Sequence, residues 1–295
     1  MKKRDYTFQM INATIFLFFA FLCIYPFYYI FIASVSDAQA VAMGKVLYFP
    51  IGFHLDNFKS VLKLDGILMA FGISTARTII GTALMLFFSI MLAYVVTKNI
   101  LPGRKWIYRA TVITLFFNAG LIPWFVIMKT LSLNNTFWLY VLPGMISPFA
   151  VILIKTYMES ISTALEESAL VDGAGYFTIL WRITAPVCLP VIAAVAVFNA
   201  VSQWNAWQDN FFLVSNPNLQ TLQLMLYNYL QQAESLARAA MQGNINLENV
   251  ASNKQLDSFS IKTTITMVTV FPIILVYPFM QKFIVKGIML GSVKG

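Results

Sequence analysis

The sequence predicts an all-α, polytopic membrane protein with six transmembrane helices. Of its 295 residues, 59% are hydrophobic and 15% are aromatic, whereas only 11% are charged, too few to cover a water-soluble fold of this size. The apolar residues form runs that reach the length of about 20 residues needed for a helix to cross a bilayer. The basic residues gather at the ends of these runs, as is typical of membrane proteins.

The first apolar run follows Lys2, Lys3 and Arg4 and has the outline of a signal peptide, with a cleavage-like pattern at residues 38–40. The run is longer and bulkier than a signal peptide, so we expect a retained first span. Five further runs have spanning length. The six predicted spans cover residues 11–33, 68–96, 108–129, 138–157, 185–206 and 261–284.

The Lys and Arg distribution predicts the orientation of these spans. With the N-terminus inside the cell, twelve of the 20 basic residues fall on the inner side, and the bias is strongest in short loops. Both termini and residues 163–184 are then cytoplasmic. Two sizeable segments, 35–66 and 208–260, are then extracytoplasmic. Within the second, residues 219–240 have the pattern of an amphipathic helix, and the following residues 241–254 are polar and without a hydrophobic period.

A charged, helix-patterned stretch interrupts the apolar chain. Thr163 and Glu166 have the spacing of a capping box that opens a helix, and Glu167 would also lie in its first turn. We expect this helix to end at Gly173, since glycine readily adopts the left-handed conformation found at helix ends.

A second short helix, residues 174–184, should follow this glycine turn. Asp172 would cap its start, and Pro186 and Pro190 would close it. The pattern therefore indicates two short helices joined by a tight turn. It fits an ordinary loop with a helical hairpin, and it equally fits an element that docks into a cleft on another protein.

The run E-S-A-L-V-D-G-A from Glu167 to Ala174, with its two downstream prolines, resembles the EAA loop of ABC-importer permeases. Ser168 stands where that family has its first alanine. The last nine residues resemble the end of MalG-like carbohydrate permeases. The stretches F-N-A-G-L-I-P-W at 117–124 and N-T-F-W at 135–138 resemble the subgroup that serves complex oligosaccharides.

This resemblance implies a MetI/MalG-like permease fold over residues 1–295, in a bacterial cell membrane, with 163–184 as the coupling helices. Its implied partners are a second permease subunit, a dimer of ATP-binding subunits, an extracytoplasmic solute-binding protein that segment 208–260 approaches, and membrane lipid. The cargo would be an oligosaccharide, with uronate-containing pectin or alginate fragments as the candidate class. The implied ATPase contacts are Glu167, Ala169, Asp172, Gly173 and Ala174, with the tail residues Lys294 and Gly295.

Polar but uncharged residues in the third and fifth spans are candidates for the translocation path. Amides can bond sugar hydroxyls, and aromatic rings can stack on the apolar face of a sugar. The same residues could instead make hydrogen bonds between helices or belong to an interfacial aromatic belt. The candidates are Asn118, Asn199, Gln203, Trp204 and Asn205.

Several other chemistries are disfavoured by the residues present. No glycine-rich phosphate-binding loop precedes a Lys-Ser or Lys-Thr pair, so we expect ATP hydrolysis on a partner and no cofactor here. His54 is the only histidine and Cys23 and Cys188 the only cysteines, which disfavours a catalytic triad or a metal site. The net charge of +8 is spread too widely for nucleic-acid binding. An ion-coupled secondary sugar carrier is the alternative function, although no predicted span holds a central acidic residue.

Overall fold

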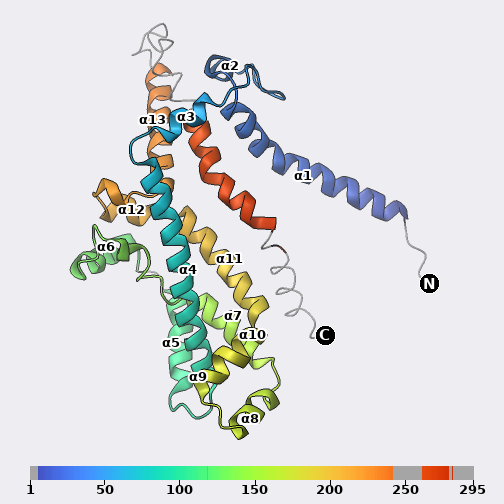
Figure 1. The fold of residues 1–295 in the computed structure, drawn as a ribbon, viewed down its shortest axis with the longest axis vertical. Coiled ribbons are helices and arrows are strands. Elements are labelled where there is room, and N and C mark those ends of the chain that lie inside the picture. Colours follow the sequence, from blue (N-terminus) through green and yellow to red (C-terminus); the bar gives the residue numbers. More distant parts are fainter. Residues whose placement is uncertain (1–5, 118, 242–260, 279–280, 282–295) are drawn as a thin grey trace. The chain divides into compact units, whose positions relative to one another are not determined.

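The computed structural model describes residues 6–117, 119–241, 261–278 and 281, whose regular elements are helices (Figure 1). The chain forms two compact units. The first comprises residues 1–67 and 226–271, and the second comprises residues 68–225 and 272–295. The predicted hairpin and the described path candidates all belong to the second unit.

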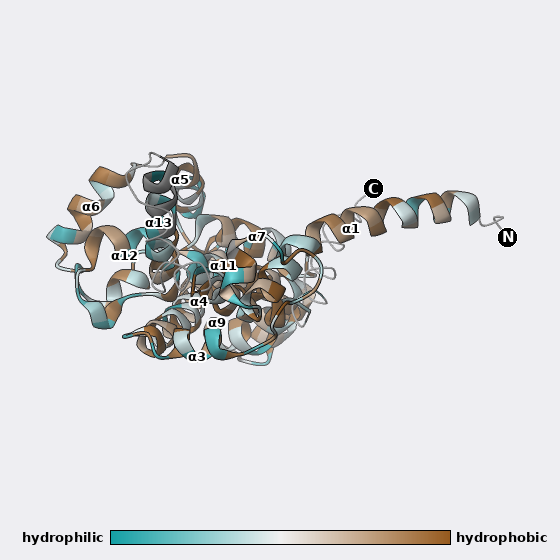
Figure 2. Cartoon of the chain, turned by 90° about the horizontal axis from the view of Figure 1, so that it is seen from above, coloured by the Kyte–Doolittle hydropathy of each residue, from teal (hydrophilic) through white to brown (hydrophobic). Residues whose placement is uncertain are grey.

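The first unit is built around the end of α1 (Tyr6–Ser34), the first predicted span. Ile32 and Ala33 pack there against Ala40 and Val41 of α2 (Ala38–Ala42). Only 6% of the most apolar part of α1 is buried within the chain, and hydrophobic residues cover most of its length (Figure 2). This helix therefore offers its surface to lipid or to another chain.

The segment after α2 folds back along α1. The Tyr25 hydroxyl donates to the Leu47 carbonyl at 3.1 Å, and the Tyr28 hydroxyl donates to the Tyr48 carbonyl at 2.6 Å. The chain then enters α3 (Asp56–Leu62). These bonds attach the predicted outer segment 35–66 to the first span.

The second unit is organised along α4 (Ile67–Thr97), which is long and apolar enough to cross a membrane. Shorter helices follow it, and α13 continues into the first unit. They are α5 (Arg104–Phe116), α6 (Leu121–Thr130), η1 (Phe137–Tyr140), α7 (Pro148–Glu159), α8 (Ala164–Val171), α9 (Tyr176–Ile179), η2 (Leu180–Thr184), α10 (Ala185–Val187), α11 (Leu189–Asn205), α12 (Gln208–Leu213), η3 (Pro217–Leu219) and α13 (Leu222–Met241).

Two predicted spans are confirmed as single helices, and the span expected at 261–284 is a single helix as far as Pro278, beyond which residues 279–280 and 282–284 lie outside the described residues. Within the described residues, α1, α4 and Ile261–Pro278 are each long and apolar enough to cross a membrane. The span expected at 185–206 is α11, which joins the preceding helix Tyr176–Val187 through an 81° bend. The amphipathic helix expected at 219–240 is α13, with Leu222, Leu224 and Leu226 buried.

The spans expected at 108–129 and 138–157 are not single helices in the structure. α5 ends at Phe116, where the chain becomes extended, and Gly120, with φ +82°, separates it from α6. The second expected span contains only the one-turn η1 and then α7, which begins at Pro148 after an extended Ser147. Hydropathy alone does not register such breaks, because the residues at them remain apolar.

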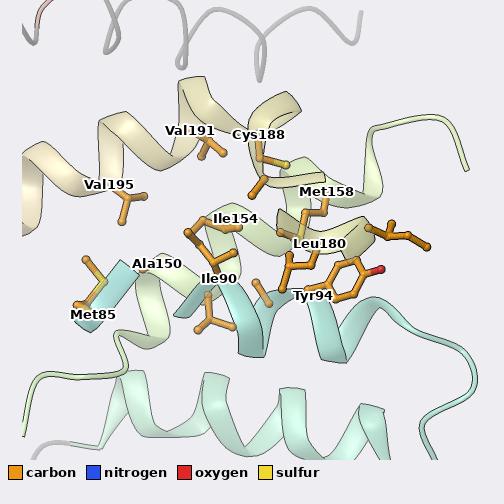
Figure 3. Close-up of a cluster of buried hydrophobic side chains, with 14 of the residues drawn as sticks. Met85, Ile90, Tyr94, Ala150, Ile154, Met158, Leu180, Cys188, Val191 and Val195 are labelled. Atoms are coloured by element: carbon orange, nitrogen blue, oxygen red, sulfur yellow. The ribbon is translucent and has the colours of Figure 1, made fainter. Parts of the chain in front are cut away.

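The core of the second unit joins five helical segments (Figure 3). Met85, Ile90 and Tyr94 come from α4, and Ile154 from α7 packs among them. The hairpin and α11 add further buried side chains to this cluster, which are Ala169, Ile179, Leu180, Ala185, Cys188, Val191 and Val195. The predicted hairpin is therefore packed into the core at one edge.

Candidate functional sites

The turn of the hairpin has the geometry that the glycine predicts. Gly173 has φ +83°. Its N–H donates to the Leu170 carbonyl at 3.0 Å, and the Ala174 N–H donates to the Ala169 carbonyl at 2.9 Å. This pair of bonds is a Schellman motif, in which a left-handed residue ends a helix and satisfies its last carbonyls. The prediction that Gly173 ends the first hairpin helix is confirmed.

The predicted capping box is wrong. Thr163 is itself in a helical conformation and its side chain makes no capping hydrogen bond. Instead, the Ala164 N–H donates to the Ser162 hydroxyl at 3.4 Å. The Glu166 carboxylate is bound to α4, where Tyr94 and Lys98 attract it away from the helix start.

The capping role predicted for Asp172 is also wrong. Asp172 is exposed and ends α8, whereas the next helix begins at Tyr176, after Gly175, without a side-chain cap. That helix continues past the expected Thr184 as far as Val187 and contains a π-helical stretch over Leu180–Thr184. The 81° bend comes at Cys188, between the two prolines, so the hairpin is not collinear with α11.

An ion pair between Lys98 and Glu166 holds the hairpin against the end of α4. The Tyr94 hydroxyl donates to the same carboxylate at 2.9 Å, and the Lys98 ammonium lies 4.0 Å from the centroid of the Tyr94 ring. The Lys98 and Glu166 side chains are 18% and 24% exposed. Partial burial makes such a group stronger than a surface ion pair, because water screens it less.

The predicted ATPase contacts divide into an inner and an outer set. Ala169 is buried and Ala174 is half-buried, so both pack the hairpin onto the core. Glu167, Asp172 and Gly173 are exposed. Two large apolar side chains accompany the outer set, since Val171 is 87% exposed and Phe177 is 64% exposed. The hairpin thus presents a tip of mixed apolar and acidic side chains around a turn that has no side chain at Gly173.

Two path candidates on α11 bind α4. The Thr82 hydroxyl donates to Asn199 Oδ1 at 3.1 Å, and Arg77 Nε donates to Gln203 Oε1 at 3.0 Å. Trp204 is buried, with an edge-to-face contact to Phe71. These contacts are the helix–helix interactions that the sequence left open as an alternative. Whether these side chains also meet a substrate stays a prediction.

Asn205 lies on an open cavity of about 890 Å³. The end of α11 and the start of α12 form one wall, and the opposite wall comes from α5 and α6. The polar and aromatic lining residues are Thr114, Phe117, Trp124, Ser202, Asn205, Trp207, Gln208 and Asp209. Asp209 is the one charged residue among the described lining residues.

Arg77 is a site residue whose role the sequence analysis missed. It lies inside the apolar helix α4, is 3% exposed and forms an ion pair with Asp209. Its guanidinium carbon lies 4.7 Å from the centroid of the Tyr140 ring. The signal available in the sequence was an arginine within a predicted span, which is rare and usually functional.

Some predicted site residues lie outside the described residues. These are Asn118, Lys294 and Gly295, together with residues 242–260 of the predicted outer segment. Among the residues that the structure does describe, no group of three His, Cys, Asp or Glu side chains could hold a metal ion.

Comparison with known proteins is consistent along the whole chain. Residues 88–290 match the family described as binding-protein-dependent transport system inner membrane component. Over 295 residues, covering all of both chains, the sequence is 32% identical to the polygalacturonan/rhamnogalacturonan transport system permease protein YtcP of Bacillus subtilis strain 168. It is 33% identical to protein LplC of the same organism, over 93% of this chain and 90% of LplC.

A solved structure extends this similarity to three dimensions. It is the crystal structure of a bacterial ABC transporter involved in the import of the acidic polysaccharide alginate. The matching chain has a TM-score of 0.81 and 28% identity, over 96% of this chain and 98% of that one. The expected resemblance to permeases of sugar importers is therefore confirmed. This multi-pass, all-α chain belongs to the family of inner-membrane components of binding-protein-dependent transport systems.

Proposed function

We propose that this chain is the permease subunit of an ATP-driven importer that carries uronate-containing oligosaccharides into the cytoplasm. The observation that supports it best is the hairpin at 163–184, whose exposed glycine turn carries apolar and acidic side chains while its base is anchored in the core. Such an element can transmit force from a partner, because its tip is free while its base is fixed. ATP is hydrolysed on a dimer of separate subunits, and this chain is not itself an enzyme.

Coupling on this proposal is mechanical. The ATP-binding subunits dock at the tip of the hairpin, and their closure moves it. The 81° bend at Cys188 means that motion reaches α11 through side-chain packing rather than along one straight helix. The Lys98–Glu166 pair carries the same motion to α4. Alternating access then requires two packings of the bundle, each favoured by a different nucleotide state.

The proposed cargo follows from the cavity and from the relatives. A volume of about 890 Å³ lies within the range of roughly 300–1,000 Å³ usual for small-molecule sites. Amides and aromatic rings suit sugar hydroxyls and sugar faces. The named relatives carry polygalacturonan or rhamnogalacturonan and alginate, which are acidic polymers. Asp209 is neutralised by Arg77, so this wall carries no uncompensated charge to repel uronates.

The remaining parts of the proposed assembly follow from the family. A second permease subunit would complete the pathway, and a solute-binding protein would deliver the cargo near segment 208–260. Both termini and the hairpin would be cytoplasmic, and Lys294 and Gly295 would approach the ATP-binding dimer.

Reconstitution into liposomes tests this function. The chain is co-purified with its partner permease, ATP-binding subunits and solute-binding protein, and uptake of radiolabelled oligogalacturonate is measured. We expect uptake that requires ATP inside the vesicle and persists when proton and sodium gradients are abolished. Uptake that follows an ion gradient without ATP would instead establish the secondary carrier. Uptake of a neutral oligosaccharide alone would refute the uronate assignment.

A further inference from the structure

All the hydrogen bonds that the structure shows for the Arg77 guanidinium go to one short segment, residues 203–209. Nε donates to Gln203 Oε1 at 3.0 Å, and Nη1 donates to the Ala206 carbonyl at 3.2 Å. Nη1 also donates to Asp209 Oδ1 at 3.0 Å, while Nη2 donates to Asp209 Oδ2. One side chain of α4 thus binds three successive points across the junction of α11 and α12.

This junction needs external support. α11 ends at Asn205, and Ala206 is extended, with φ −74° and ψ 129°. The last carbonyls of a helix lack partners within it, and Arg77 supplies one at Ala206. Asp209 lies in the first turn of α12, so its bond to Arg77 also fixes where α12 starts. A single guanidinium therefore binds both sides of the break between the two helices.

The same junction is a wall of the large cavity. Residues 205–209 all line it, whereas Arg77 does not and is 3% exposed. Arg77 therefore acts through the wall and does not touch a molecule in the cavity. Lysine could not replace it, because an ammonium is a single point of charge and cannot reproduce the planar fork.

We propose that Arg77 is a positioning residue that sets the shape of the cavity wall at residues 205–209, and through it which oligosaccharides pass. The role in selecting oligosaccharides rests on the proposed transport function, whereas the role in shaping the wall does not. A wall held by bidentate bonds presents Asn205, Trp207 and Gln208 at fixed places, so substrates are selected by the spacing of their hydroxyls and rings.

The first test measures the wall itself. Asn205→Cys is introduced together with Cys23→Ser, and the rate at which a methanethiosulfonate reagent labels the protein in nanodiscs is followed by mass spectrometry. The background from Cys188 is low because that residue is buried. The neutral pair Arg77→Met/Asp209→Asn removes the fork without leaving a lone buried charge. We expect it to change the labelling rate at Asn205→Cys severalfold.

The matched control is Thr82→Val on the same helix, which removes the hydrogen bond from α4 to Asn199 at 3.1 Å but leaves the junction intact. It should leave the labelling rate unchanged. Equal labelling in the neutral pair and the parent would overturn the proposal. If the neutral pair does not elute as a folded protein, Arg77→Lys replaces it. We expect its labelling rate at Asn205→Cys to differ from that of the parent, and an unchanged rate would overturn the proposal.

The second test measures selection by transport. In the reconstituted importer, the neutral pair should lower uptake of the preferred oligosaccharide by about tenfold or more, since small displacements in a binding site have large effects. Uptake of shorter or longer oligomers should fall by a different factor. Equal losses for all lengths would contradict the role in selection. Parent protein that carries no oligosaccharide would refute the transport function, yet the labelling result would still decide the role of Arg77.

Discussion

Gly81 on α4 lies against Gln203, with no room for a side chain at its position. A Cβ built there would lie 2.8 Å from Gln203 Nε2, closer than such contacts allow. Gln203 cannot retreat freely, because its Oε1 accepts a hydrogen bond from Arg77. The glycine therefore makes room for the amide that helps to hold Arg77.

We predict that Gly81→Ala lowers the free energy of unfolding by about 1–2 kcal/mol, the loss of a charge-assisted hydrogen bond less the usual helix gain of alanine. Denaturant unfolding in detergent measures this. The control is Gly72→Ala on the same helix, where no atom lies within 4 Å of the added Cβ, and which should be stabilising by about 0.5–1 kcal/mol. In a Gln203→Ala background the Gly81 penalty should vanish, and an undiminished penalty would exclude the steric explanation.

Local chemistry was predictable at single residues, and distant partners were not. Gly173 was assigned as a helix end from its neighbours, and the structure agrees. Glu166 was assigned to a cap, but its partner Lys98 lies 68 positions away. Arg77 and Asp209 are 132 positions apart, and nothing in the local pattern of either indicates the other.

At the scale of elements, helix caps differ in what they contribute. Ser147 precedes α7 in an extended conformation, and its hydroxyl accepts from the Ala150 N–H at 3.3 Å. Thr163 has a helical conformation and no such bond. In the sequence Thr163 has the stronger capping pattern, because Glu166 follows it three residues later.

Alanine substitution should separate them. Ser147→Ala is expected to lower the free energy of unfolding by about 1 kcal/mol, the usual value of an N-cap. Thr163→Ala should stay within about 0.5 kcal/mol of the parent, as expected of a surface change. Thermal unfolding in the same detergent compares both. Equal losses of unfolding free energy in the two variants would mean that Thr163 does cap its helix.

Element boundaries explain why two of the six expected spans are not single helices. The third and fourth expected spans contain Gly120 and the Pro143–Gly144 pair, and the chain leaves the helical conformation near each. Their side chains remain apolar enough for the hydropathy pattern to continue. Length and hydropathy predicted α1 and α4 correctly, and both helices continue unbroken although α1 contains Pro26 and α4 contains Gly72 and Gly81.

At the scale of the whole molecule, the proposed role of the hairpin is to contact the ATP-binding subunits. A Cβ at Gly173 would meet no atom of the described residues within 4 Å, so the cost of a side chain that the structure shows is that of its left-handed backbone. Asparagine tolerates that conformation. Gly173→Asn should therefore leave the fold intact while it places a side chain in the proposed docking surface.

We predict that Gly173→Asn abolishes ATP-driven uptake and weakens co-purification of the ATP-binding subunits. Gly103→Asn is the matched control, with φ +76°, no atom within 4 Å, and a place in the loop between α4 and α5. It should transport as the parent does. Normal uptake by the Gly173 variant would mean that the hairpin is not the docking element.

Two ion pairs tie α4 to other elements, one from Arg77 in its first half to Asp209 and one from Lys98, the residue after its end, to Glu166. These arginine and lysine residues are separated by roughly 31 Å along the axis, from the usual rise per residue. If α4 tilts as a rigid helix, its displacement at Arg77 and its displacement at Lys98 are coupled. If the proposed transport function holds, thermodynamic linkage makes the coupling reciprocal: cargo in the cavity and nucleotide on the partner subunits change each other's binding free energy by the same amount.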